Sequence, residues 1–403
     1  MSRKGGVPGD GPSAGFETRA IHGGRTGSGN ESPLVPQICQ SATFAIPSVR
    51  AGAEMMRGER SGAVYTRLGN PTVERLESVL AGLEDGTDAL VTSSGMAAAA
   101  TVLFGLLGPG DRVACSATMY GGTRELLEQE LRRFGVTTTI VDTTRIERLE
   151  QAIAGGARLV WLESPANPNL QLTDLAAAAR VARDNGALSV ADNTFATPLL
   201  QRPLTLGIDV VVHSLTKALN GHSDVVAGAI VTADPQLAAQ LRSTRTRLGG
   251  VADPHQAWLV LRGIKTLPVR VRAAQENAQR LAALLADHPA VSHVRYPGAA
   301  RGAERELFER QMDGPGTMLG FELAGGADAA VRAVESLAVI TLAGSLGGVE
   351  SLAMHPASMS HVAMDAAELA EARIAPGLVR LSVGCESFED LRRDVLAALD
   401  DER

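Results

Sequence analysis

The central part of the chain, from Asp88 to Thr232, alternates between short apolar runs and longer segments whose apolar residues recur at helical spacing. The short runs are almost continuously apolar, which is typical of strands that are covered on both faces. They predict seven strands, at Ala89–Thr92, Arg112–Cys115, Thr138–Val141, Leu159–Leu162, Leu188–Val190, Asp209–Val212 and Ala229–Val231. The intervening segments predict helices, among them Met96–Leu107, Gly122–Phe134, Ile146–Ala154 and Asp174–Asp184, the last with Thr173 as its N-cap. This alternation predicts an α/β domain with a mostly parallel sheet.

The pattern changes on both sides of this region and divides the chain into three parts. Residues 1–65 are rich in proline and glycine and predict a flexible tail, Met1–Gly15, followed by an extended arm. Residues 66–265 hold the α/β domain. Residues 266–403 predict a smaller α+β domain with a long helix, Val269–Asp287, and with apolar runs around Leu319–Leu323, Ile340–Leu342 and Val379–Val383.

Composition and charge argue against several classes of protein. The 403 residues include 45% apolar and 21% charged residues, which is typical of a folded globular protein. Because 38 Lys and Arg face 45 Asp and Glu, for a net charge of −7, and no basic block occurs, no nucleic-acid partner is expected. The longest apolar run, Met96–Leu107, is shorter than the ~20 residues that cross a bilayer, so no membrane partner is expected either.

Cysteine usage gives no sign of a disulfide framework or of a thiolate metal site. The three cysteines, Cys39, Cys115 and Cys385, are odd in number and widely separated, and no CxxC pair occurs. The N-terminal stretch lacks the apolar core of a signal peptide. We therefore expect no metal and a cytoplasmic location.

The candidate catalytic and binding residues directly follow the predicted strands, at the edge where a parallel sheet binds its ligands. Successive strands are followed by Asn167, Asp192 and Lys217, and the turn before the first predicted helix, at Gly95, can present helix N–H groups to a phosphate. Taken singly, these residues are as compatible with caps and surface positions. Together they fit pyridoxal 5′-phosphate, since a lysine forms a Schiff base with its aldehyde and a carboxylate keeps its pyridine nitrogen protonated. Tyr120 is a candidate for stacking on the ring, and packing in its turn is the alternative.

Five segments then resemble a known family: Tyr65–Thr72 (YTRLGNPT), Ser94–Ala97 (SGMA), Glu163–Pro168 (ESPANP), Asp192–Thr194 (DNT) and His213–Lys217 (HSLTK). From Thr18 to Gly384, the chain resembles the transsulfuration (Cys/Met metabolism) family of enzymes that depend on pyridoxal 5′-phosphate. The resemblance implies the fold of type I: a mostly parallel seven-stranded sheet in a large domain, with a smaller α+β C-terminal domain.

The resemblance also implies a role for each matching residue. Lys217 binds the cofactor and moves protons, Tyr120 stacks on the ring and assists acid–base steps, and Asp192 pairs with the pyridine nitrogen. The phosphate is held by Gly95, Met96, Ser214 and Thr216, and by Tyr65 and Arg67 of a neighbouring subunit. The substrate carboxylate is bound by Arg380, with Asn167 and Ser345 beside it. Such a shared site implies at least a dimer, and the family is usually tetrameric. His213 is expected to pack or hydrogen-bond behind the site.

The reaction that the resemblance implies is γ-elimination on L-methionine or a related homocysteine derivative, giving 2-oxobutanoate, ammonia and a thiol. The segments His355–His361 and Glu163–Asn169 look most like methionine γ-lyases. However, Gly122 stands where those enzymes carry cysteine, and Gly344 where cystathionine enzymes carry a glutamate for the distal amine. The loop Arg247–Val251 has the shorter length typical of cystathionine enzymes.

Several alternatives follow from these mixed positions. The first is γ-replacement on an O-acylhomoserine, as in cystathionine γ-synthases and O-acylhomoserine sulfhydrylases. Cystathionine γ-lyase activity is another, as is β-elimination from cystathionine or cysteine. A binding or regulatory protein that has lost catalysis is disfavoured, because Lys217, Asp192, Tyr120 and Arg380 are all retained. The expected small-molecule partner is thus a sulfur amino acid or an activated homoserine.

Overall fold

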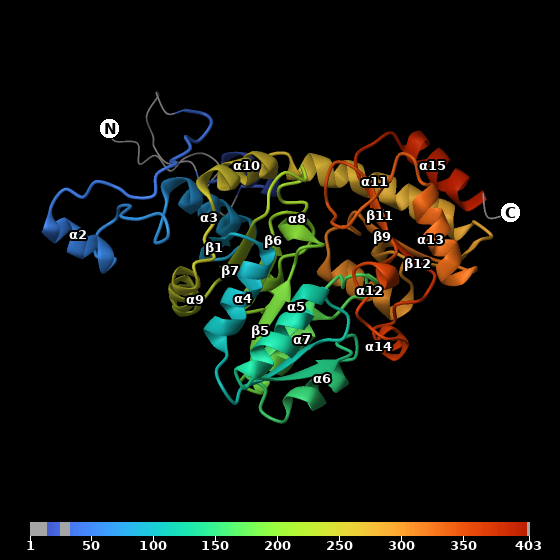
Figure 1. Cartoon of the computed structure of the whole chain (residues 1–403), viewed down its shortest axis with the longest axis horizontal. Coiled ribbons are helices and arrows are strands. Elements are labelled where there is room, and N and C mark those ends of the chain that lie inside the picture. Colours follow the sequence, from blue (N-terminus) through green and yellow to red (C-terminus); the bar gives the residue numbers. More distant parts are fainter. Residues whose placement is uncertain (1–13, 25–32, 401–403) are drawn as a thin grey trace.

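The computed structural model describes residues 14–24 and 33–400 and contains two β-sheets in two adjoining domains (Figure 1). The larger sheet has the strand order β1-β7-β6-β5-β4-β2-β3. Strand β7 runs antiparallel to both of its neighbours, and all other neighbouring pairs are parallel. The strands are β1 (Asp88–Thr92), β2 (Arg112–Ser116), β3 (Thr137–Val141), β4 (Leu159–Glu163), β5 (Leu188–Asp192), β6 (Val210–Ser214) and β7 (Gly228–Thr232). All seven predicted strands and the mostly parallel sheet are confirmed; the predicted tail lies almost wholly outside the described residues.

Helices cover both faces of this sheet, as its apolar strands require. One face packs on α4 (Gly95–Leu106), the π-helical segment η1 (Leu126–Leu131) and α9 (Pro235–Leu248), and α5 (Gly121–Glu125), which precedes η1, contacts α4. The other face packs on α3 (Pro71–Leu83), α6 (Ile146–Ile153), α7 (Leu175–Asp184) and α10 (Pro254–Ile264). Two short helices, α8 (Thr197–Leu200) and η2 (Pro203–Leu206), connect β5 to β6.

The structure modifies two details of the predicted helices. The helix expected at Gly122–Phe134 is present as one continuous helical span, but its middle, η1, is π-helical. The N-cap of α7 is Asp174 rather than Thr173, because the Asp174 carboxylate accepts a hydrogen bond from the Ala177 N–H at 2.9 Å. The hydroxyl of Thr173 instead bonds that of Thr143 at 2.7 Å.

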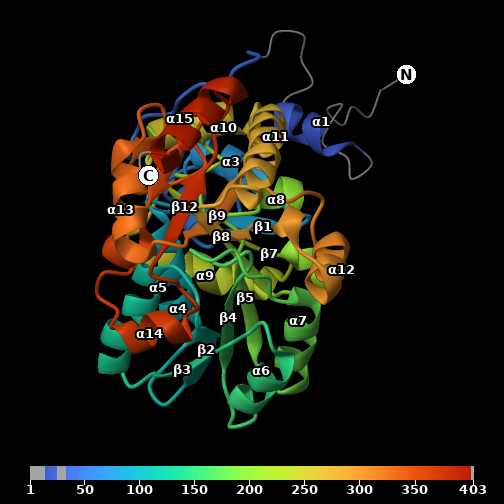
Figure 2. The ribbon, with the colours of Figure 1, turned by 90° about the vertical axis from the view of Figure 1, so that its right-hand side faces the viewer.

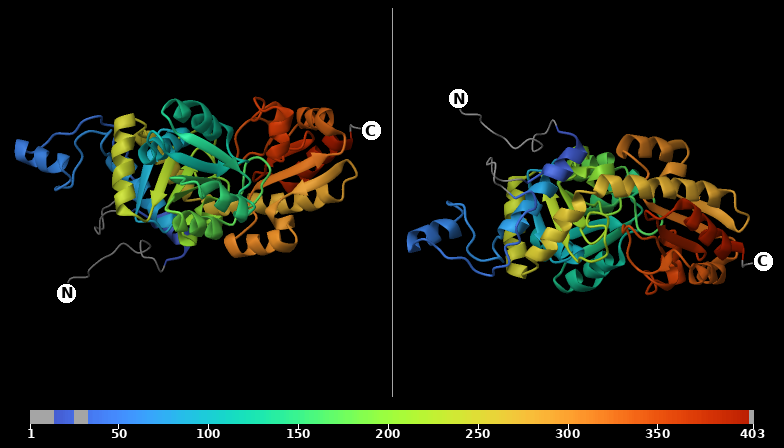
Figure 3. Two further views of the ribbon diagram at one scale, coloured as in Figure 1. Left: turned by 90° about the horizontal axis from the view of Figure 1, so that it is seen from below. Right: turned by 90° about the horizontal axis from the view of Figure 1, so that it is seen from above.

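The smaller sheet has the order β10-β11-β12-β9-β8. Its strands are β8 (Val291–Arg295), β9 (Met318–Leu323), β10 (Thr341–Leu342), β11 (Leu352–Met354) and β12 (Leu378–Ser382). Helices α11 (Leu267–Ala286), α13 (Gly326–Ser336) and α15 (Phe388–Asp400) pack on it, and α12 (Gly302–Gln311) and α14 (Ala366–Glu371) lie at its periphery (Figure 2). Helix α11 joins the domains, since Leu267 and Val271 belong to the core of the first and Leu281 and Leu285 to that of the second (Figure 3).

The segment before α3 contains two short helices and extended connections. Helix α1 (Phe16–His22) contacts α3, whereas α2 (Val49–Met56) stands away from the body of the molecule (Figures 1 and 3). This arm exposes large apolar side chains, including Val49, which is 94% exposed, and Met56, which is 67% exposed. In the described part of the chain, no helix combines the length and the apolarity that crossing a bilayer requires.

Candidate active site

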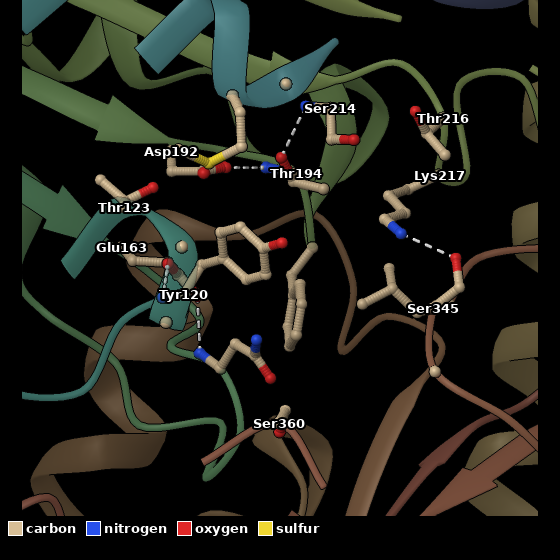
Figure 4. A pocket seen from close by; sticks show the side chains of 18 of the residues that line it. Tyr120, Thr123, Glu163, Asp192, Thr194, Ser214, Thr216, Lys217, Ser345 and Ser360 are labelled. Atoms are coloured by element: carbon tan, nitrogen blue, oxygen red, sulfur yellow. Dashed lines mark hydrogen bonds between the residues drawn. The ribbon is translucent and has the colours of Figure 1, made fainter. Parts of the chain in front are cut away.

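A cavity of about 580 Å³ lies at the carboxyl ends of the parallel strands, between the two domains. This volume is typical of a small-molecule site. Ten of the predicted site residues line it: Gly95, Met96, Tyr120, Asn167, Asp192, Ser214, Thr216, Lys217, Ser345 and Arg380. Figure 4 labels Tyr120, Asp192, Ser214, Thr216, Lys217 and Ser345 among them. The structure thus brings together groups that are separated by almost 300 residues of sequence.

Two predicted site residues, Tyr65 and Arg67, do not reach this cavity in the single chain. They line a separate hollow, with Val251 and Asp253 on its other side. The Arg67 guanidinium lies 5.6 Å from the Tyr65 ring centroid and donates a hydrogen bond to the Thr246 carbonyl. Tyr65 is 43% exposed, so its ring is available to another molecule.

Lys217 follows β6 and points into the cavity from the side of the larger sheet (Figure 4). Its Nζ donates a hydrogen bond of 2.7 Å to Ser345 Oγ, which belongs to the other domain. Burial, and then the charge of Arg380, lower the pKa of the Lys217 amine. A neutral amine is the form that acts as a nucleophile or base, so the surroundings prepare Lys217 for that chemistry.

Asp192 is the last residue of β5, and it supplies a carboxylate to the floor of the cavity. Burial raises the pKa of this carboxyl, while hydrogen bonds from Thr194 and the charge of His213 act in the opposite direction. One of those bonds runs from the Thr194 N–H to Oδ1, at 3.0 Å. His213 is fully buried next to Glu84, whose Oε1 lies 2.5 Å from Nε2, so the predicted position behind the site is confirmed.

The N-terminus of α4 forms one wall of the cavity. The Ser94 hydroxyl caps the Ala97 N–H at 3.0 Å, and the first N–H groups of the helix, at Gly95 and Met96, have no preceding turn to bind. Gly95 allows Ser214 to approach closely, since a Cβ at residue 95 would lie 3.0 Å from the Ser214 Cβ. Such a helix end, with hydroxyls beside it, binds anions such as phosphate.

Arg380 reaches the cavity from β12 of the smaller domain. Its Nη1 donates to Asn167 Oδ1 at 2.7 Å, and its Nη2 donates to the Ser345 carbonyl at 2.9 Å. Burial lowers the pKa of Arg380 to about 10, which leaves it charged at neutral pH, and the carboxylate of Glu163 favours that charge. Within the described residues, Nε has no partner, and the two bonds above use only part of the donor capacity of the guanidinium. The remaining donors suit a carboxylate.

Glu163 is a site residue that sequence reasoning missed. It ends β4 in register with Asp192 and is 4% exposed. Its Oε2 accepts from the Tyr120 N–H at 2.8 Å, and its Oε1 accepts from the Asn167 N–H at 2.7 Å. Burial and the neighbouring Asp192 raise the pKa of Glu163, whereas these two bonds and Arg380 lower it. The rule that singled out Asp192, a polar residue at a strand end, applies equally to Glu163.

A lysine and a carboxylate that are both partly buried at the strand ends of an α/β sheet, with an arginine from a second domain, define a site of the pyridoxal-phosphate class. The chain belongs to the family of Cys/Met metabolism PLP-dependent enzymes, whose model matches residues 17–400. Its cofactor is therefore pyridoxal 5′-phosphate.

Individual relatives are similar over nearly their full length. The chain is 46% identical to the L-methionine gamma-lyase of Pseudomonas deceptionensis, over 96% of this chain and 97% of that protein. It is 40% identical to the cystathionine gamma-lyase of Bacillus subtilis, over 95% of this chain and 99% of that protein. The crystal structure of cystathionine gamma synthase from Xanthomonas oryzae pv. oryzae, in complex with aminoacrylate and cysteine, matches with a TM-score of 0.90 and 42% identity, over 96% of this chain and 98% of that one.

The residues that line the cavity fit this cofactor. Asp192 forms no ion pair with a lysine or arginine among the described residues, so its half-buried carboxylate suits a protonated pyridine nitrogen. The Gly95 end of α4 suits the phosphate, and the low-pKa amine of Lys217 suits the aldehyde. Among residues 14–24 and 33–400, no cluster of His, Cys, Asp or Glu is arranged to hold a metal ion.

Proposed function

We propose that the protein is a carbon–sulfur lyase that catalyses γ-elimination on L-methionine or a related homocysteine derivative. Water enters the overall reaction, and 2-oxobutanoate, ammonia and a thiol leave. The observation that carries the proposal is the position of Ser345, which binds Lys217 through its hydroxyl and Arg380 through its carbonyl. An amino acid whose carboxylate lies on Arg380 then has its Cα proton beside the Lys217 amine.

Each of the described groups has a distinct task in this mechanism. Arg380, supported by Asn167, binds and orients the substrate carboxylate. Lys217 takes the proton from Cα, a second proton is then lost from Cβ, and Lys217 or Tyr120 protonates the departing sulfur. The bound cofactor supplies an electron sink for the negative charge that develops at Cα. Asp192 maintains that sink by holding the pyridine nitrogen protonated, and the wall formed by Gly95, Met96, Ser214 and Thr216 holds the phosphate.

The site is complete only in an oligomer under this proposal. Tyr65 and Arg67 lie outside the cavity of their own chain and are exposed next to the projecting arm, so we assign them to the phosphate of a neighbouring subunit. The assembly is then a tetramer built from dimers with shared sites, and it acts in the cytoplasm.

Methionine is favoured over cystathionine by the cavity wall at Gly344. This residue offers no charge to the distal amine of cystathionine, and a Cβ built on it meets nothing within 4 Å, so the wall is open and uncharged here. The relatives named methionine gamma-lyase, at 46% and 45% identity, support the same choice.

Gamma-replacement on an O-acylhomoserine is the second candidate, and Gly122 favours it. A Cβ at residue 122 would lie 2.8 Å from Tyr120 Cε1 and 3.1 Å from Met96 Sδ. The Tyr120 ring therefore occupies space that a cysteine at this position would need. This geometry differs from the methionine γ-lyase pattern and leaves the ring close to α5.

The two reactions separate in one assay. Cofactor-loaded protein is incubated with methionine, cystathionine, O-acetylhomoserine or O-succinylhomoserine, each with and without an added thiol, and 2-oxobutanoate and the product mass are measured. The proposal expects 2-oxobutanoate from methionine without a thiol, and loss of that product in Lys217→Ala. If methionine gives none, while an acylhomoserine plus thiol gives a thioether, the protein is a replacement enzyme instead.

A further inference from the structure

One charged residue of the cavity wall has no place in the chemistry described above. Among the described residues, five charged side chains line the cavity: Glu125, Glu163, Asp192, Lys217 and Arg380. Glu163 is buried with both of its oxygens bound to backbone N–H groups, and Lys217 and Arg380 both bind Ser345. Glu125, the last residue of α5, is exposed, and its side chain forms no hydrogen bond or ion pair with any described residue.

The neighbouring arginine does not neutralise Glu125. The guanidinium of Arg124 donates to Glu128 at 3.0 Å and lies 3.5 Å from an oxygen of Glu368 on α14. One positive charge thus faces two other carboxylates, and Arg124 forms no ion pair with Glu125. Glu125 therefore contributes a negative charge without an ion-pair partner among the described residues to the wall of the cavity.

Glu125 lies on a different element from the groups that are assigned to the α-carboxylate. It shares its wall with Gly121, Gly122 and Thr123, whereas Arg380 and Ser345 come from the smaller domain. Because Gly121 and Gly122 carry no side chain, nothing on these two residues shields a substrate from the Glu125 carboxylate. A substrate that is anchored at Arg380 therefore has only its distal group left to face α5.

We propose that Glu125 selects substrates by the charge of the γ-substituent, accepting neutral or cationic ends and rejecting a carboxylate. This inference rests on the proposed function, since it assumes an amino acid held at Arg380. The substrate class is then a homocysteine or homoserine derivative with a neutral end, such as a thioether or an acetyl ester, or with an amine. Acyl esters that end in a carboxylate, such as the succinyl ester, are disfavoured.

The test uses three amino acids of similar length that have no leaving group, so it does not depend on the reaction. L-Norleucine has a neutral end, L-lysine a cationic end and L-2-aminopimelate a carboxylate. Their dissociation constants are measured on the cofactor-loaded protein by calorimetry, at low and at high salt. In wild type, aminopimelate is expected to bind about five- to tenfold more weakly than norleucine, the size of one partly solvated charge–charge interaction, and lysine at least as well as norleucine.

Variants assign the effect to one carboxylate. Glu125→Gln should abolish the difference between aminopimelate and norleucine, Glu125→Arg should reverse it, and Glu125→Asp should retain most of it. Glu130→Gln is the matched control, because Glu130 is exposed on the adjacent π-helical segment, pairs with Arg133 and does not line the cavity; it should leave the ratio unchanged. High salt should reduce the wild-type difference.

Two results would overturn the inference: equal affinities for aminopimelate and norleucine in wild type, or a ratio that Glu125→Gln leaves unaltered. Failure of the proposed function gives a different result, since a protein that forms no 2-oxobutanoate from methionine can still show the charge preference.

Discussion

Replacing Glu163 by glutamine tests whether this buried carboxylate holds two walls of the cavity together. Its two oxygens accept backbone N–H groups of Tyr120 and Asn167, at 2.8 and 2.7 Å. Asn167 in turn accepts from Arg380. Glutamine keeps one acceptor oxygen but turns an NH₂ donor toward the other N–H, so one buried backbone donor loses its partner.

The expected magnitude follows from that single lost bond. A buried donor without a partner costs about 1–3 kcal/mol. If the site relieves this cost by moving Asn167 or Tyr120, the loss appears in substrate binding, where each ~1.4 kcal/mol is a factor of about ten. We therefore expect Glu163→Gln to raise KM about five- to 100-fold, with a smaller change in the affinity for the cofactor.

The assay is steady-state kinetics together with a thermal melt, and a second variant separates positioning from stability. Asp394 also accepts backbone N–H groups, those of Ala338, Val339 and Ile340, but it lies away from the cavity. Asp394→Asn should lower Tm and leave KM unchanged. The reasoning is refuted if Glu163→Gln lowers Tm as Asp394→Asn does and leaves KM at the wild-type value.

Three further predictions concern the groups around the substrate. Arg380→Lys removes the two-pronged donor and should raise KM about 10- to 100-fold without altering the absorption of the bound cofactor; an unchanged KM would remove Arg380 from the carboxylate site. In cofactor-free protein, the acylation of Lys217, followed by peptide mapping, should have its midpoint below the usual lysine pKa of 10.5, because burial and Arg380 disfavour the ammonium form. Arg380→Gln should move that midpoint upward, and a midpoint that stays in place would contradict the role of the Arg380 charge. Gly122→Cys should displace the Tyr120 ring, since the new Cβ would start 2.8 Å from Tyr120 Cε1, and kcat should change in parallel with the cofactor spectrum; a variant with both unaltered would show that the ring has room to spare.

Much of the fold could be predicted from the sequence because the strands of the larger sheet are buried on both faces. Their runs of apolar residues stand out from the amphipathic helices around them. The smaller sheet gave weaker signals: β8 contains Ser292, His293 and Arg295 on a partly exposed edge, and β11 has only three residues. Neither strand was predicted. The π-helical turn after α5 also has no signature in the spacing of its apolar residues.

The candidate site likewise contains residues that a local sequence pattern predicts and residues that it does not. Asn167, Asp192 and Lys217 could be found by one rule, that ligands bind where parallel strands end. Arg380 lies within a strand of the other domain, so no local pattern distinguishes it from a structural arginine. Ser345 lies in a loop of that domain and was found through the family resemblance, as Arg380 was. Glu163 follows the same strand-end rule, but the sequence does not reveal that its carboxylate binds the backbone of Tyr120 and Asn167.

The hydrogen bond from Lys217 to Ser345 crosses from one domain to the other. Arg380 likewise donates to one residue of each domain, Asn167 and Ser345. The geometry of the reacting groups thus depends on the relative position of the two domains, and neither domain contains the complete site alone. A substitution far from the cavity that shifts one domain by a fraction of an ångström would change both the Lys217–Ser345 and the Arg380–Asn167 contacts at once. Substitutions at the interface between the domains can in this way change the activity of the enzyme, while every side chain in the cavity remains the same.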